Sequence, residues 1–325
     1  MKRLLPLRLR ASTARWRYMA TNEQIDAWTE GKKRNAEAEN LKQHTKRSLA
    51  CMQLALALPD QTLPQVPAAF RAFPNSLART ALFSCLRKEA ERLDYKEHFV
   101  ASLANIRLSY TGQELSQNDA SVFMSILHCA AGNFDGGEYF IARFSVHAFL
   151  KEIGWTTNSS GYARVDQSIT RLKANALRMT ADEEKTGFVG SLLGDLTFEG
   201  TEKNRIYVIK IHRNIVGLFK RESYTRLLLR QRNQIRSPLG KWLHSFWSGH
   251  RNPMPYTVAL IATLCGSKTK KVYHFRTMLR DACEELVREG FLAEFYIDQN
   301  DLLHVKRKKI LTQDSPREVQ AMSRQ

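Results

Sequence analysis

The chain has 325 residues, 43% of them hydrophobic, and its 50 lysines and arginines against 32 aspartates and glutamates give a formal net charge of +18. This length suffices for two domains plus tails, and the charge predicts a polyanionic partner, either nucleic acid or an anionic membrane. A membrane-spanning helix does not fit, because the longest apolar stretch, Leu49 to Pro59, is broken by Gln53 and falls far short of the ~20 residues required. The five cysteines are scattered and contain no CxxC pair, which argues against a disulfide framework or a zinc site and favours a reducing bacterial cytoplasm.

The N-terminal region, residues 1–70, is predicted to be basic and largely flexible, ending in a linker. Its first twenty residues are rich in arginine and lack acids, which suits a disordered leader or a transit peptide, and Met19 is an alternative start. A polar helix is predicted from Trp28 to Ala50, and four prolines between residues 59 and 74 then break the chain. At the other end, residues 310–325 are predicted to be a disordered polar tail.

A first domain is predicted over residues 71–212 from hydrophobic periodicity and turn residues. Its expected elements are a helix Gln117–Ala131, a strand with Tyr139, Ile141 and Phe144 facing inward, a short helix ending at Gly154, a long helix Tyr162–Met179, and two strands, Gly187–Leu196 and Arg205–Ile211.

A second domain, residues 213–309, is predicted to repeat that order. Its expected elements are a helix Leu239–Trp247, an extended piece Met254–Tyr256, a short helix ending at Gly266, a long helix Lys270–Glu289, and two strands, Phe291–Ile297 and Leu302–Lys306. A winged helix-turn-helix consists of a short helix, a turn, a long helix and a two-stranded ribbon, which is the order found in both predicted domains. The predicted fold class is therefore α+β, with tandem winged helix-turn-helix domains and flexible N- and C-terminal tails.

The long helix of the first domain has a core stripe formed by Val165, Ile169, Leu172 and Ala176. Its opposite arc mixes small residues with Gln, Thr and Arg, which suits a surface that enters a DNA groove, although an ordinary solvated face would look similar. We expect Gln167 and Arg171 to read bases. The predicted DNA contacts of this domain are Tyr162, Arg164, Gln167, Thr170, Arg171, Ala174 and Arg178, with Lys203 and Arg205 at the wing tip.

The long helix of the second domain has a core stripe of Val272, Phe275, Leu279, Cys283 and Leu286. Its first turns are basic and its later turns acidic, which opposes the helix dipole and suits insertion of the N-terminal half into a groove. The predicted contacts here are Lys268, Thr269, Lys270, Lys271, Tyr273, His274 and Thr277.

Basic residues also dominate the chain from Arg213 to Arg280, where 14 lysines and arginines accompany one acid, Glu222. Such residues are typical phosphate contacts, which position a protein without reading sequence. The predicted phosphate contacts are Arg226, Arg230, Arg232, Arg236 and Lys241. Lys306 and Arg307, in a basic run over residues 306–309, are either further contacts or part of a solvated tail.

Catalytic patterns are missing from the sequence. The nine histidines form no HxH or HExxH pattern, no Walker A sequence occurs, and the histidine–arginine spacings do not fit a tyrosine recombinase. We therefore expect no enzyme, no cofactor and no metal site, which disfavours a DNA-processing enzyme. A winged-helix transcriptional repressor that binds an operator, including that of its own gene, remains the alternative to a replication protein.

Six strings resemble the TrfA family of plasmid replication initiators, in collinear order over about residues 50–308. They are RAFPNSLARTALF (71–83), LSYTGQEL (108–115), LKEIGW (150–155), SGHRNPMPY (248–256), LCGS (264–267) and DACEELVREGFL (281–292). The resemblance implies tandem winged-helix domains that bind iterons, which are directly repeated sites in double-stranded origin DNA, then promote local melting and recruit host machinery. It also implies host DnaA, the DnaB helicase and the polymerase sliding clamp as partners, and we expect a monomer–dimer equilibrium.

A clamp-binding peptide is expected just ahead of the linker, where this family carries one. Gln53, Leu54 and Leu56 resemble the Gln-Leu-x-Leu-Phe pattern of such peptides. Ala57 stands where the final Phe would be, so the aromatic anchor is absent and a plain amphipathic patch is an equal alternative.

Overall fold

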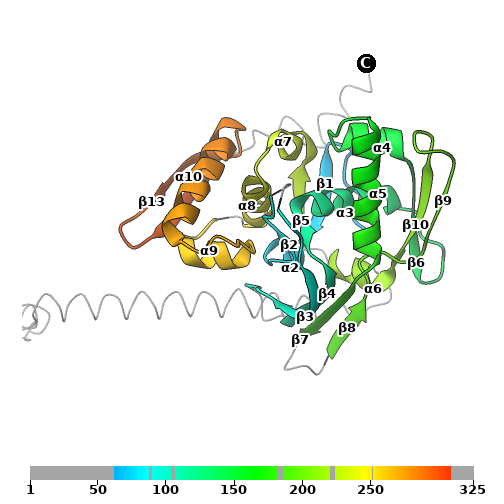
Figure 1. Ribbon diagram of the computed structural model, residues 1–325, viewed down its shortest axis with the longest axis horizontal. Coiled ribbons are helices and arrows are strands. Elements are labelled where there is room, and N and C mark those ends of the chain that lie inside the picture. Colours follow the sequence, from blue (N-terminus) through cyan, green and yellow to red (C-terminus); the bar gives the residue numbers. More distant parts are fainter. Residues whose placement is uncertain are drawn as a thin grey trace, which may run out of the picture. The chain divides into compact units, whose positions relative to one another are not determined.

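The computed structural model describes residues 62–87, 90–103, 107–181, 186–219, 224–250 and 252–308 (Figure 1). The predicted polar helix Trp28–Ala50, the clamp-type peptide at Gln53, Leu54 and Leu56, and the predicted tail 310–325 lie outside the described residues. Among the residues that are described, none of the helices has the length and apolar character needed to cross a membrane.

The first domain contains α3 (Gln117–Ala130), β6 (Tyr139–Ser145), α4 (Val146–Glu152), α5 (Ser159–Lys173), β9 (Leu196–Glu199) and β10 (Ile206–His212). Its three strands form an antiparallel sheet in the order β6-β10-β9. Gly154 ends α4 with a φ of +70°, a conformation that favours glycine. This element order and strand order match those expected of a winged helix-turn-helix.

The predicted end of the long helix is wrong, because α5 stops at Lys173 rather than at Met179. The side-chain amide of Asn175 donates to the carbonyls of Arg171, at 2.9 Å, and Leu172, at 2.7 Å, which satisfies the last turn. The chain then enters β7 (Ala176–Ala181), where Leu177 and Met179 are buried. Ala174, Ala176 and Arg178 are therefore not helical.

The structure contains a four-stranded sheet that was not predicted from the sequence. Its strands are β3 (Asp94–Val100), β4 (Arg107–Gln113), β7 and β8 (Thr186–Gly190), in the order β3-β4-β7-β8. The single strand predicted over Gly187–Leu196 is wrong, because β8 belongs to this sheet and β9 to the wing. Between them the chain turns at Gly194, where a Cβ would lie 2.8 Å from the carbonyl oxygen of Lys210. The loop after Glu199 joins β9 to β10, as predicted.

The prediction of which β6 side chains face the core is wrong by one residue at the start of the strand. Phe140, Ala142 and Phe144 are buried, whereas Tyr139 and Ile141 are half-buried. The register against β10, in which Phe140 pairs with Ile211 and Ala142 with Ile209, fixes which face packs on the core.

The second domain contains α8 (Pro238–Ser248), β12 (Tyr256–Thr257), α9 (Val258–Leu264), α10 (Val272–Arg288), β13 (Leu292–Ile297) and β14 (Leu302–Arg307), with strand order β12-β14-β13. These elements follow the predicted ones within a few residues. One assignment is wrong: Val272 begins α10 and is 47% exposed, so it does not belong to the core stripe.

The remaining elements join the two domains. Two strand pairs belong to this group: β1 (Phe70–Pro74) pairs with β11 (Tyr224–Leu228), and β2 (Phe83–Ser84) pairs in parallel with β5 (Leu115–Ser116). The other members are α2 (Asn75–Ala78), α6 (Arg213–Val216), the 3₁₀ turn Gly217–Phe219 and α7 (Leu229–Gln234). One buried core runs from Leu63 to Leu227, and the other from Ile235 to Leu303 with Cys85 added. Part of the predicted linker, at Leu63 and Val66, therefore packs on the first core, as do residues 215–219 and Leu227 from the segment assigned to the second domain.

Candidate nucleic-acid interface

The N-terminal half of α10 presents a basic and aromatic surface. Lys270, Lys271, His274 and Thr277 are exposed, and Tyr273 is 56% exposed. The ring centroids of Tyr273 and His274 lie 4.0 Å apart with the ring planes tilted by 39°, and Lys271 Nζ lies 5.8 Å from the Tyr273 ring centroid. The opposite face is buried through Phe275, Leu279, Cys283 and Leu286. The predicted division of this helix into a core face and an outer face is thus confirmed, except at Val272.

The turn before α10 is tied to Glu114 through Lys268. Lys268 Nζ lies 2.6 Å from a carboxylate oxygen of Glu114, which is buried at the N-terminal side of α3. The hydroxyl of Thr269 lies 3.6 Å from the sulfur of Met278. Lys268 is therefore neutralised by the first domain, and this pair fixes the turn rather than leaving a lysine free for phosphate.

The outer face of α5 is only partly available. Gln167 and Thr170 are exposed, and the Arg164 guanidinium lies 4.9 Å above the Trp155 ring. Tyr162 is 5% exposed and its hydroxyl is 2.9 Å from His147 Nδ1, so its predicted role as a DNA contact is wrong.

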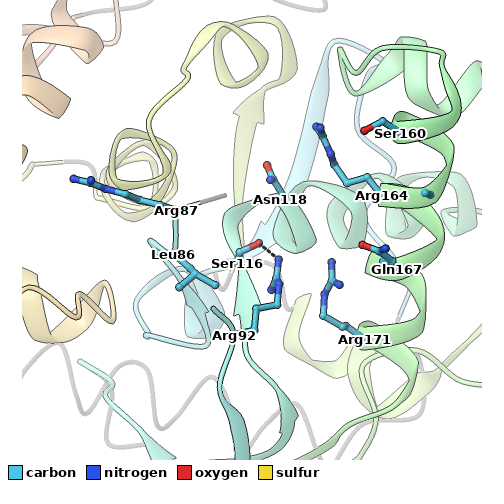
Figure 2. A pocket seen from close by; sticks show the side chains of 10 residues that line it. Leu86, Arg87, Arg92, Ser116, Asn118, Ser160, Arg164, Gln167 and Arg171 are labelled. Atoms are coloured by element: carbon cyan, nitrogen blue, oxygen red, sulfur yellow. Dashed lines mark hydrogen bonds between the residues drawn. The ribbon is translucent and has the colours of Figure 1, made fainter. Parts of the chain in front are cut away.

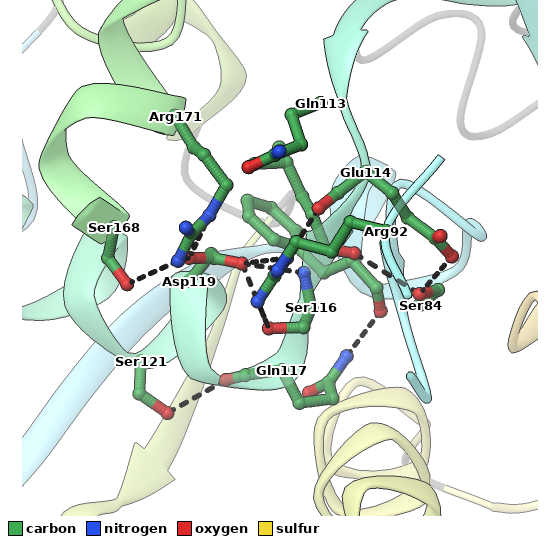
Figure 3. A network of polar contacts seen from close by, with 12 residues as sticks. Ser84, Arg92, Gln113, Glu114, Ser116, Gln117, Asp119, Ser121, Ser168 and Arg171 are labelled. Carbon is green, nitrogen blue, oxygen red and sulfur yellow. Dashed lines mark hydrogen bonds and ion pairs between the residues drawn. The ribbon is translucent and has the colours of Figure 1, made fainter. Parts of the chain in front are cut away.

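Arg171 serves the fold, contrary to the prediction that it reads bases (Figure 3). Its Nη2 and Nε donate to Asp119 Oδ1 at 2.9 and 3.2 Å, and Arg92 donates to Oδ2 at 3.1 Å. Asp119 is fully buried and also accepts the Ser116 backbone N–H at 2.8 Å, which caps α3. Burial opposes ionisation of this carboxyl, but the charges of Arg171 and Arg92 outweigh it and hold the pKa of Asp119 below its usual value.

A cavity of about 290 Å³ lies beside α5. Figure 2 shows Arg164, Gln167 and Arg171 projecting from α5 toward Arg92 and Ser116 across it. Its lining, which contains four arginines and no acid among the described residues, is Leu86, Arg87, Arg92, Ser116, Asn118, Ser160, Ala163, Arg164, Gln167 and Arg171. Arg87 and Arg92 were not predicted as members of this surface, because neither belongs to a helix expected from the sequence.

Two further predicted phosphate contacts are structural. Arg232 is 1% exposed and donates to Gln117 Oε1 (3.0 Å), Ser121 Oγ (3.1 Å), Ser245 Oγ (2.8 Å) and the Lys241 carbonyl (3.0 Å), and burial lowers its pKa to about 9. Arg307 donates to the carbonyls at the end of α8, including that of His250 at 3.1 Å, and burial lowers its pKa.

The other predicted basic contacts differ in how accessible they are. Arg226 on β11, Arg230 on α7, Arg236 after α7, Arg178 on β7 and Lys203 in the wing turn are exposed. Arg205 lies 3.2 Å from Asp166, and Lys306 lies 2.9 Å from Glu294. Lys241 is half-buried, and desolvation lowers its pKa to about 8. Ala174 is exposed but follows the end of α5.

The described residues contain no group of three or more His, Cys, Asp or Glu side chains placed to hold a metal ion. What they do contain is two helix-turn-helix units, each with a sheet of three strands, on a strongly basic chain. The fold is therefore a mixed α and β fold, in which the pairs α4–α5 and α9–α10 take equivalent places in the element order.

The family model described as TrfA protein matches residues 23–307, so the chain belongs to the TrfA family. A plasmid replication initiator protein TrfA from Escherichia coli is 28% identical over 297 residues, which cover 89% of this chain and 75% of that protein.

Two solved structures show weaker similarity. Domains 2 and 3 of RctB match with a TM-score of 0.46 and 12% identity, over 69% of this chain and 92% of that one. The Pi initiator protein in complex with iteron DNA matches with a TM-score of 0.44 and 12% identity, over 61% of this chain and 97% of that one. At these scores, the assignment of the fold depends on the strand orders described above.

Proposed function

We propose that this chain is a plasmid replication initiator that binds directly repeated sites, or iterons, in double-stranded origin DNA. The observation that carries the proposal is the start of α10, where Lys270 and Lys271 just before the helix and Tyr273 and His274 in its first turn are exposed, while the opposite face of the helix is buried in a core. A recognition helix docks in the major groove through this end. Membership of the TrfA family and the +18 charge support the same function.

In the proposed complex, α10 is the main reading element. Lys270 and Lys271 contact phosphates, while Tyr273, His274 and Thr277 face base edges. In the first domain, Gln167 and Thr170 take the corresponding role on α5, and the arginine-lined cavity beside them accepts a backbone phosphate through Arg164 and Arg87. Two domains of equivalent topology then bind two segments of one repeat, residues 71–212 and 213–309 being the proposed division.

Initiation needs more than binding. Many phosphate contacts release counterions from the DNA, which makes binding more favourable. The free energy gained in this way offsets the cost of bending the origin and of melting an adjacent AT-rich segment. We infer that the bound protein then recruits host DnaA and the DnaB helicase, with the sliding clamp as a further partner through residues 53–56, and that monomers and dimers exchange. No covalent step is involved, so the chain acts as a binding protein and not as an enzyme.

A complementation experiment tests this function. A small plasmid that carries the origin of this replicon, but lacks the gene for this chain, should replicate only when the chain is supplied in trans. The double variant Tyr273→Ala/His274→Ala should abolish maintenance, whereas the matched double variant Tyr296→Ala/His304→Ala, whose rings stack at 4.4 Å on the hairpin, should support it. Replication that proceeds without the chain, while transcription from its promoter rises, would instead identify a repressor.

A further inference from the structure

Two cysteines that are far apart in the sequence meet in the second core, beside the turn that precedes α10. Cys85 follows β2, and Cys265 caps the end of α9. Both are buried, at 8% and 0% exposure, and their sulfur atoms are 3.5 Å apart. The backbone N–H of Cys85 donates to the Cys265 carbonyl at 2.8 Å, so the two segments touch through the main chain as well.

Contacts on either side hold these segments together independently of the sulfurs. A Cβ at Gly266, whose φ is +64°, would lie only 2.9 Å from Cβ of Ser84, so the two segments approach more closely than a side chain at position 266 would allow. The Ser84 hydroxyl donates to Glu114 at 3.0 Å, and Glu114 also binds Lys268 at 2.6 Å. The sulfurs need to approach by only about 1.5 Å to reach bonding distance, which is ~2.05 Å.

The two thiols are not equivalent. The hydrogen bond between the two sulfur atoms lowers the pKa of Cys85, whereas burial raises the pKa of Cys265. Cys85 is also the slightly more exposed of the pair. This asymmetry is typical of a pair in which one thiolate reacts first and the second thiol resolves the product.

We propose that Cys85 and Cys265 are a disulfide-forming site that responds to a small hydroperoxide. The Cys85 thiolate attacks one oxygen of hydrogen peroxide, the O–O bond breaks, and sulfenic acid and hydroxide result. The Cys265 thiol then attacks the Cys85 sulfur, the S–O bond breaks, and water leaves with the thiol proton. Overall, two thiols and one hydrogen peroxide give one disulfide and two waters, with sulfur oxidised and peroxide reduced.

The disulfide would cross-link the segment after β2 to the end of α9, next to the turn that leads into α10. It closes a very long loop, which restricts the unfolded chain more than a short loop does. The bond therefore stabilises the folded arrangement of β2 against α9. This inference concerns the fold of the chain and stands independently of the proposed DNA-binding function.

The test uses the purified full chain, treated with hydrogen peroxide and then with an alkylating reagent. We expect a peptide pair joined through Cys85 and Cys265, about 2 Da lighter than the sum of its reduced peptides. Thermal unfolding of the oxidised chain should occur at least ~5 °C higher than that of the reduced chain.

Two variants separate this site from general thiol oxidation. Cys129→Ser, which replaces a thiol packed against the first core, should keep both the cross-link and the thermal shift. Cys85→Ser should lose both, while its melting temperature without peroxide stays within ~2 °C of the reduced wild type, which shows that it folds. Alkylation of both cysteines after peroxide treatment, or oxidation of Cys85 to sulfinic acid without a cross-linked peptide, would overturn the proposal.

Discussion

The helices α5 and α10 occupy equivalent places in the two domains, yet they use their polar side chains differently. On α5, Tyr162 bonds to His147, Asp166 binds Arg205, and Arg171 binds Asp119. At the N-terminal end of α10, Lys270, Lys271 and Tyr273 remain exposed. Equal topology therefore does not imply equal readout, because several polar side chains of α5 pair with residues of the same chain while those at the start of α10 stay exposed.

The difference follows from what surrounds each helix. The α5 helix lies against α3, whose buried Asp119 needs two guanidiniums to stay ionised in a buried position. The α10 helix packs on α8 and α9 mainly through apolar residues, and its acids, Asp281, Glu284 and Glu285, come only in the later turns. In the N-terminal half of α10, Arg276 pairs with Asp301 at 2.7 Å. Lys270 and Lys271, just before the helix, are exposed, which favours contact with an external polyanion.

The largest effect is expected where an arginine holds the two domains together. Arg232→Ala should lower the free energy of unfolding by about 3 kcal/mol, because it leaves the buried acceptors on Gln117, Ser121 and Ser245 unpaired. Urea unfolding measures this loss. Arg230→Ala, which removes an exposed arginine from the same helix, is the control and should change stability by less than ~0.5 kcal/mol. Equal losses for both variants would remove the distinction between structural and surface arginines.

Arg171→Ala sharpens the comparison between the two helices directly. We expect a loss of about 2 kcal/mol in stability, because Asp119 stays buried with one guanidinium fewer. Fluorescence anisotropy measures the affinities for a cognate repeat and for a scrambled duplex. The ratio of these two affinities should stay the same as in the wild type. Thr170→Ala is the matched control for the exposed face. A loss of base preference in Arg171→Ala without a loss of stability would restore Arg171 as a base-reading residue.

The double variant Lys270→Ala/Lys271→Ala tests the exposed end of α10. Two lost phosphate contacts should reduce the slope of log K against log salt by about 2 and weaken binding roughly tenfold near 0.1 M salt. The control is Lys306→Ala, which removes a lysine already paired with Glu294 at 2.9 Å and should change the slope less. An unchanged slope in the double variant would place the DNA elsewhere.

The smallest effect concerns Lys241, whose pKa is lowered from 10.5 to about 8 by desolvation. The unfolded chain binds the proton more tightly than the folded one, so stability rises with pH between about 8 and 10.5. Lys241→Met should therefore be more stable than wild type at pH 7, by about 1 kcal/mol after allowance for partial exposure. That advantage should disappear as the pH approaches 10.5, which unfolding curves across this range would show; a constant difference would contradict the pKa shift.

The second domain was predictable because its signals are local. The apolar spacing of α8, α9 and α10 is regular, and Gly266 marks the end of the short helix as expected. The four-stranded sheet was missed because β3, with the sequence DYKEHFV, is mostly exposed, and because Ala176 and Met179 on β7 continue the apolar spacing of α5. The register of β6 was missed because apolar residues occupy both of its faces.

The candidate site was predictable in position but not in detail. The exposed residues of α10 follow from helical spacing, since each lies opposite a core residue. Arg230 and Arg232, in contrast, are two residues apart in a basic segment, and only the tertiary fold shows that the second is buried. A guanidinium that binds phosphate and one that binds buried carbonyls require the same residue type, so sequence alone does not separate them.

Footprinting of the full chain on the replicon that carries its gene tests the central claim most directly. We expect protection of several direct repeats next to an AT-rich segment, with protection lost in Lys270→Ala/Lys271→Ala and retained in Lys306→Ala. Protection of one palindrome at a promoter, or salt-sensitive binding without a preferred site, would contradict it.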